Sequence, residues 1–174
     1  MEKHDSVQEI VAKFFSEARD INPYASAATM RALDQVIRNT LSGDLVAAAA
    51  VWRHRYQEAS AEIPAPSRDN PFPDHHLLQK AKQLKALADH LSQLASQVAA
   101  LEAPSQDRVY NRIRDNTALL DTLIEVDRAL AAIARRIEAS SLATSPMDTN
   151  ALELGLSELE SLLRQRRQIL AGTP

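Results

Sequence analysis

Histidine and carboxylate side chains are the groups in this chain that could hold a metal ion. A di-iron helical bundle needs Glu-x-x-His pairs, because that spacing places both ligands on one inward helical face. None of the glutamates is followed by a histidine three residues later, and the zinc-binding His-Glu-x-x-His motif is also absent. His75 and His76 are adjacent, so their side chains diverge on a helix, and His54 can pair with Glu58 one turn later. We therefore expect solvated surface histidines and no metal site.

Groups that could bind phosphate or attack a substrate are missing as well. Gly43, Gly155 and Gly172 are isolated, so no glycine-rich phosphate loop can form. The chain has no cysteine, and none of its serines lies in the elbow motif of serine hydrolases. The sequence thus predicts a protein that is not an enzyme, with no catalytic residues and no cofactor.

Three arginines near the C-terminus could suggest an anion site. Arg164, Arg166 and Arg167 fall in the final turns of the last predicted helix. Cations there complement the negative end of the helix dipole. We therefore interpret these arginines without a bound ligand.

The overall composition argues against nucleic acid and membrane partners. The net charge of −3 gives no electrostatic reason to expect either nucleic acid or an anionic membrane surface. The most apolar window, 45–52, is far shorter than the roughly 20 residues that span a bilayer. The residues after Met1 show no signal-peptide pattern. We expect a cytoplasmic protein.

Residue usage predicts an all-α fold with about six helices. Ala and Leu dominate, while only 4% of residues are aromatic and only three are glycine. Straight side chains of this kind favour helix over strand. Apolar residues recur at three- and four-residue spacing over about 7–20, 23–41, 45–61, 75–102, 106–140 and 146–171. The last three helices, joined by short turns, are expected to form a long antiparallel three-helix bundle.

Turn-forming residues divide these helices into two units. Ser42-Gly43-Asp44 is predicted as a turn, because Gly43 can adopt a positive φ and Asp44 can cap the following helix. The alanines at 47–50 leave room for a neighbouring backbone to approach closely. Four prolines within 64–73 exclude helix and favour an extended geometry. We therefore predict a short-helix unit at 1–61, a Pro-rich linker at 62–74 and a long-helix bundle at 75–174.

Two positions leave alternatives open. Asn116 occupies a position of the helical repeat that is otherwise filled by aliphatic residues. It either fixes the register between helices or lies where its helix extends beyond its partners. Pro71-Phe72-Pro73 either docks on an aromatic-lined partner or is an ordinary linker with one anchoring phenylalanine.

Part of the chain resembles a known family. From Met30 to Glu62 the sequence shows a helix, a Leu-Ser-Gly-Asp-Leu turn and an Ala-rich helix. A Pro-rich break follows, and then long Leu-rich helices that contain the run from Leu119 to Asp127. This pattern resembles the small helical chaperones of flagellar and related type III export, which hold unassembled filament-cap or hook-junction subunits in the cytosol. The resemblance implies an apolar groove that binds the helical end of a cargo protein.

Apolar stripes wider than one coiled-coil seam run along every predicted helix. If three helices cannot cover these stripes, the remaining surface must meet a partner, because soluble monomers rarely leave large apolar patches open. We expect a non-catalytic interaction protein: a chaperone or adaptor that binds a partner helix, or a scaffold that binds itself. A helical ligand-binding protein or enzyme without a recognisable motif is the remaining alternative. The residues expected at the partner surface, or otherwise in the core, are Leu84, Leu91, Val98, Leu119, Val126 and Leu156.

Overall fold

The computed structural model confirms the all-α class. It describes residue 24 and residues 26–68, 71–72, 74–101, 106–142 and 149–172, and this part of the chain contains five helices and no strand. The helices are α2 (Ala27–Ala61), α3 (His75–Ala99), α4 (Asp107–Arg114), α5 (Thr117–Leu142) and α6 (Thr149–Ala171). The helix predicted at 7–20 and the first residues, 146–148, of the last predicted helix lie outside the described residues.

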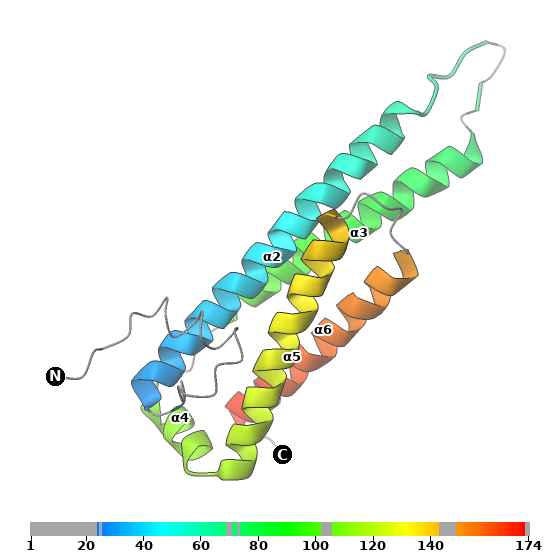
Figure 1. Cartoon of the computed structure of the whole chain (residues 1–174). Coiled ribbons are helices and arrows are strands. Elements are labelled where there is room, and N and C mark those ends of the chain that lie inside the picture. The colour runs from blue at the N-terminus through cyan, green and yellow to red at the C-terminus, as the bar shows by residue number, and fades with distance from the viewer. Residues whose placement is uncertain are drawn as a thin grey trace.

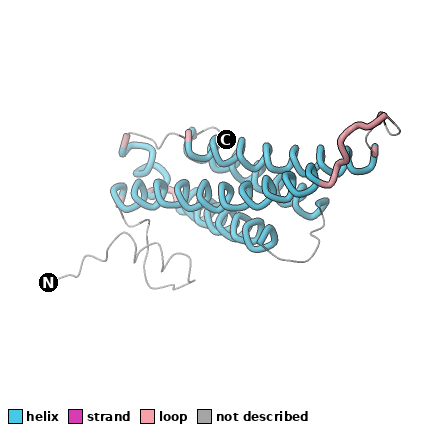
Figure 2. The backbone as a smooth tube through the Cα atoms, turned by 90° about the horizontal axis from the view of Figure 1, so that it is seen from above, coloured by secondary structure: helices cyan, strands magenta, loops and turns pink. Residues whose placement is uncertain are grey.

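The four long helices run up, down, up and down around a shared core (Figure 1). α2 packs against α3 and α5, and α5 packs against α6, while the short α4 connects the two antiparallel pairs at one end. The α2–α3 hairpin continues past the ends of α5 and α6, so its loop projects from the bundle (Figures 1 and 2). Where α5 ends, the Trp52 indole donates to Ser141 Oγ at 2.9 Å and Arg55 donates to the Ser141 carbonyl at 2.9 Å.

α2 is one continuous helix, so the turn predicted at Ser42-Gly43-Asp44 is wrong. Buried Leu41 and Leu45 lie four residues apart on either side of Gly43, and the apolar stripe continues to Trp52 without a break. A glycine inside a helix costs about 1 kcal/mol relative to alanine. Burying each leucine contributes about 1.5–3 kcal/mol, which exceeds that cost. Packing therefore decides the local conformation, and the Gly-Asp turn of the resemblance is not formed.

A single hydrophobic core spans the regions predicted as separate units. Its buried members come from every described helix, and they include Met30, Trp52, Leu91, Leu130 and Leu159. Residues 62–74 lie between two helices that pack directly on each other. The segment thus closes a helical hairpin within one core.

Small residues bring α2 and α3 close together, as the alanines at 47–50 predict. Ala48 and Ala49 are buried, and Ser42 Oγ donates to the Ala95 carbonyl across the pair at 3.1 Å. Asp74 caps α3, since its side chain accepts from the His76 N–H at 2.7 Å.

The helix predicted at 106–140 is divided in two by a bend at Asp115 and Asn116. Asn116 is exposed, and its Oδ1 accepts from the Leu119 N–H at 3.2 Å, which satisfies an open amide at the start of α5. Neither role expected for Asn116 is therefore observed. At the other end of the chain, α6 ends at Ala171, where the predicted helix also ends, and Gly172 follows with φ of 77°.

The two glycines Gly43 and Gly172 give a test of the continuous helix. Gly43→Ala is expected to raise the free energy of unfolding by about 0.5–1 kcal/mol, because no atom lies within 4 Å of the added methyl group. Gly172→Ala should lower it, because its positive φ disfavours alanine and the methyl group would meet Arg112. Denaturant unfolding measures both variants. A loss of stability in Gly43→Ala would mean that a turn interrupts α2.

Candidate functional site

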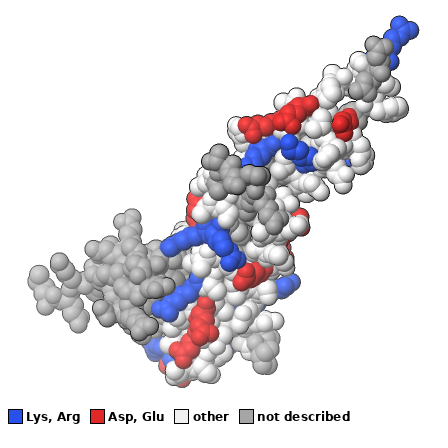
Figure 3. All heavy atoms as spheres, turned by 45° about the vertical axis from the view of Figure 1, so that its right-hand side comes forward, with Lys and Arg blue, Asp and Glu red and all other residues white. Residues whose placement is uncertain are grey.

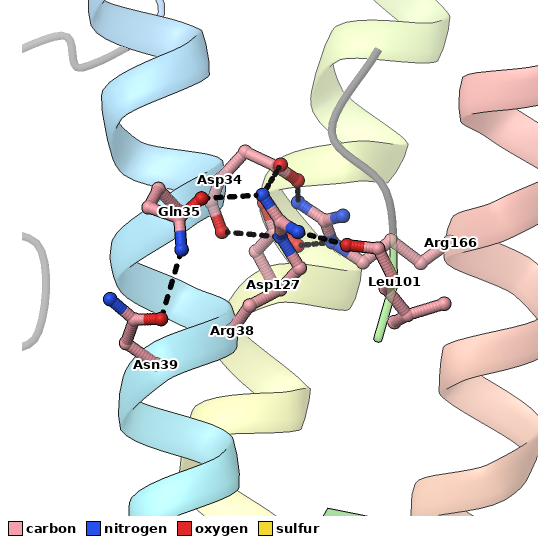
Figure 4. Close-up of polar contacts among 7 residues, drawn as sticks. All are labelled: Asp34, Gln35, Arg38, Asn39, Leu101, Asp127 and Arg166. Atoms are coloured by element: carbon pink, nitrogen blue, oxygen red, sulfur yellow. Dashed lines mark hydrogen bonds and ion pairs between the residues drawn. The ribbon is translucent and has the colours of Figure 1, made fainter. Parts of the chain in front are cut away.

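A buried arginine joins three helices at the centre of the bundle (Figure 4). Arg166 of α6 is 4% exposed, and its Nη2 lies 2.6 Å from Asp34 Oδ1 of α2. Its Nε donates to Asp127 Oδ1 of α5 at 2.7 Å. One guanidinium thus makes charged contacts with two helices that are far apart in sequence from its own.

Two further side chains complete this buried cluster. Arg38 lies one turn after Asp34, and its Nη2 is 3.0 Å from Asp34 Oδ2. Arg38 also donates to the Leu101 carbonyl at the end of α3, which adds a fourth segment. The Tyr24 hydroxyl donates to Asp127 Oδ2 at 3.2 Å. The two aspartates and two arginines carry no net charge, which is the condition under which buried charges are tolerated.

Burial and charge act in opposite directions on the pKa values of this cluster. Burial raises the pKa of Asp127, and the adjacent Arg166 opposes that rise. Burial alone would lower the pKa of Arg166, but Asp127 and Asp34 outweigh it and raise the pKa above its ordinary value. Burial and Asp127 likewise raise the pKa of Tyr24. Arg166 and Tyr24 therefore keep their protons at neutral pH. The ion pairs of Arg166 with Asp34 and Asp127 link α6 to α2 and α5.

Tyr110 of α4 lies beside the cluster without joining it. The side chain is 1% exposed, and its hydroxyl has no hydrogen-bond partner among the described residues. Burial and the charge of Asp34 raise the pKa of Tyr110 to about 12. An unpaired buried hydroxyl costs about 1–3 kcal/mol, so Tyr110 weakens the bundle at this point.

Arg166 is buried, which the helix-dipole interpretation did not anticipate, whereas Arg164 and Arg167 are exposed. Arg166 lies three residues after buried Leu163 and three before buried Ile169, on the apolar stripe of α6. Asp34 and Asp127 also interrupt apolar stripes of their helices. Charged residues at otherwise apolar positions of a helical repeat are the sequence signal that could have identified the cluster.

Four of the six residues expected at a partner surface are buried in the chain's own core. They are Leu91, Val98, Val126 and Leu156, with exposures of 0%, 0%, 3% and 0%. Leu84 and Leu119 are half-buried and pack against the same core. The sequence allowed either a partner surface or the core, and the core is observed for these four residues, because α2 runs the length of the bundle as a fourth helix and covers stripes that three helices would leave open. These four side chains are therefore not a partner surface in the observed fold.

A shallow groove of about 290 Å³ lies on the outer face of the α2–α3 pair. We call it the α2–α3 groove. It is lined by small residues, with one larger apolar side chain, Val46, that is 55% exposed and one cation, Arg53. The lining residues are Ser42, Val46, Ala49, Ala50 and Arg53 of α2 and Ser92, Ala95, Ser96 and Ala99 of α3.

The serines of the α2–α3 groove use their protons within the protein. Ser92 Oγ donates to the Ala88 carbonyl and Ser96 Oγ to the Ser92 carbonyl, both at 2.9 Å, and Ser42 donates across the helix pair. A hydroxyl has one proton to donate, so these groups have none left for water or a ligand. The groove therefore presents a mostly apolar, close-packed surface.

The remaining surface offers weaker candidates. A crevice of about 170 Å³ between α3 and α6 is lined mainly by polar side chains, including Gln97, Glu160 and Arg164. Phe72 in the projecting loop is 80% exposed, so it does not anchor the loop to the described part of the chain. On the face shown in Figure 3, acidic and basic side chains are interspersed, and neither sign forms a continuous field.

Two of the described histidines pair with glutamates. His54 pairs with Glu58 at 3.4 Å, as predicted, and His90 bridges α3 and α6 through Glu160 at 2.9 Å. Within the described residues no three His, Cys, Asp or Glu side chains form a group that could hold a metal. None of the described helices is both long and apolar enough to cross a membrane.

No protein family, curated protein or solved structure matches this chain. The site is therefore interpreted from its own geometry.

Tyr24 and Tyr110 give a matched pair of substitutions at the buried cluster. Tyr24→Phe removes a hydrogen bond to a buried carboxylate and should lower the free energy of unfolding by about 1.5–3 kcal/mol. Tyr110→Phe removes a hydroxyl without a described partner and should leave stability unchanged or raise it by about 1 kcal/mol. Urea denaturation followed by circular dichroism measures both. Equal losses in the two variants would contradict the described network.

Proposed function

We propose that this chain is a non-catalytic protein-interaction protein, a cytoplasmic adaptor or chaperone that binds a helix of another protein in the α2–α3 groove. The observation that carries the proposal is the outer face of the α2–α3 pair. It combines small lining residues, the half-exposed Val46 and serine hydroxyls that already donate within the protein. These properties suit a packed helix better than they suit a polar ligand.

The small side chains allow a third helix to approach closely. Interaxial distances between packed helices are about 8–10 Å and depend on the side chains at the contact. Ala50 and Ala99 are exposed there and end in methyl groups, whereas Ala49 and Ala95 are buried. Desolvating this surface also costs little, because its hydroxyl protons are already bonded within the protein.

The helix α2, which forms one side of the groove, packs against the bundle on its opposite face. The inner face of α2 packs against α5, and its Asp34 and Arg38 belong to the buried cluster. A preformed surface of this kind binds with a smaller ordering cost than one that must fold on contact. The bundle thus supports the groove in the shape that the partner would meet.

Ala50→Arg tests the proposal, with Ala132→Arg as the matched control. Both alanines are exposed on helices, but Ala50 lines the groove and Ala132 lies on α5. A partner recovered by affinity capture and identified by mass spectrometry should bind Ala50→Arg at least about tenfold more weakly, since a lost contact of about 1.4 kcal/mol has that effect. Its affinity for Ala132→Arg should be unchanged.

Light scattering on the same proteins separates the other candidates. A wild-type chain that is a stable oligomer, and that Ala50→Arg converts to a monomer, would identify a self-associating scaffold instead. Equal affinity of the captured partner for both variants would overturn the proposed site.

A further inference from the structure

Arg53 stands at one end of the α2–α3 groove without a counter-charge. Its side chain is exposed, and its Nη2 donates to Ser92 Oγ at 3.1 Å. No carboxylate of the described residues pairs with it. Two cations of α3 differ in this respect, because Lys85 pairs with Asp89 at 2.6 Å and Lys80 with Glu62 at 3.3 Å.

Arg53 is also the donor that the groove offers to a ligand. The hydroxyl protons of Ser42, Ser92 and Ser96 are committed to backbone carbonyls. A guanidinium has five N–H groups, so a single bond to Ser92 leaves others available. The complementary surface is therefore apolar along the groove and carries an acceptor, preferably an anion, at this end.

The dimensions of the groove limit the length and the side chains of what it holds. Ser42 and Arg53 are eleven residues apart, which corresponds to about 16 Å or three turns of helix. An engineered cavity of about 150 Å³ accommodates benzene. The groove, at about 290 Å³, therefore has room for about two aliphatic side chains.

We propose that the partner helix seats two aliphatic side chains, one turn apart, in the α2–α3 groove and places a carboxylate of its next turn against Arg53. This inference rests on the proposed function and names the chemistry of its partner. The pair would be partly desolvated on binding, so that it contributes more to partner choice than an exposed surface pair does.

A second copy of the chain is a poorer occupant than another protein. A two-fold axis parallel to the groove would place Arg53 against its own copy, with like charges opposed. A two-fold axis perpendicular to the groove would place Arg53 opposite the end formed by Ser42 and Ala99, whose lining contains no carboxylate. Either symmetric arrangement leaves the cation without a counter-charge, which favours a partner that supplies one.

Stapled helical peptides test the inference on the full chain. Two probe peptides each carry two leucines four residues apart. One has a glutamate one turn before the leucines and the other has it one turn after them. Each probe has a twin, a control peptide with lysine in place of the glutamate. The glutamate peptide with the higher affinity should bind the wild-type chain at least about fivefold more tightly than its lysine twin. This difference in affinity should decrease at high salt. Arg53→Glu should reverse this order, whereas Arg167→Glu, at an exposed position on α6, should leave it unchanged. Circular dichroism checks that each variant is folded.

The outcomes separate this inference from the proposed function. If glutamate and lysine peptides bind equally, and both lose affinity with Ala50→Arg, the groove binds helices but Arg53 does not select a carboxylate. If the peptides bind and Ala50→Arg has no effect, the proposed binding site itself is wrong. If neither glutamate peptide binds the wild-type chain, the stated partner chemistry is overturned.

Discussion

The arrangement of the helices depends on the ion pairs of one buried guanidinium. Arg166 has Asp34 and Asp127 on either side, and each of the three residues belongs to a different helix. Sliding α6 by one turn would move the guanidinium about 5.4 Å along the bundle, which would break both of its ion pairs and leave Asp127 buried without a counter-charge. Contacts between leucines and alanines alone would tolerate such a shift much better, because each apolar side chain would exchange one apolar neighbour for another. The cluster therefore selects a single register, at some cost in stability compared with an apolar core.

The same constraint explains why the outer groove exists. Asp34 and Arg38 lie near the start of α2, while Trp52 holds its later part against the end of α5. These contacts hold α2 along the whole bundle as one continuous helix beside α3. A turn at Gly43 would separate Ser42 from Val46 and Ala50 and divide the groove. The proposed function thus depends on the continuity of α2, which depends on packing on the opposite side of the helix.

Local sequence signals predicted much of the fold, and tertiary packing decided the rest. Composition was sufficient for the all-α class, and the helices predicted to begin at residue 75 and to end at residue 171 match the start of α3 and the end of α6. Gly43 was assigned to a turn because nothing in its neighbours shows that α3 and α5 pack along both halves of α2. The same lack of tertiary information left open whether Leu91 and Val126 lie in the core or at a partner surface. The α2–α3 groove could not be found either, since alanines on an outer helical face look the same in a sequence whether or not a second helix borders them.

The free energies of unfolding of Arg166→Leu and Arg167→Leu test the central role of the buried cluster most directly. Arg166→Leu leaves two buried carboxylates without this partner and should cost about 3–5 kcal/mol, a large part of the stability of a domain of this size. Arg167→Leu, next to it but exposed, should change stability by less than about 0.5 kcal/mol. Equal and small effects in the two variants would show that Arg166 does not hold α6 against α2 and α5.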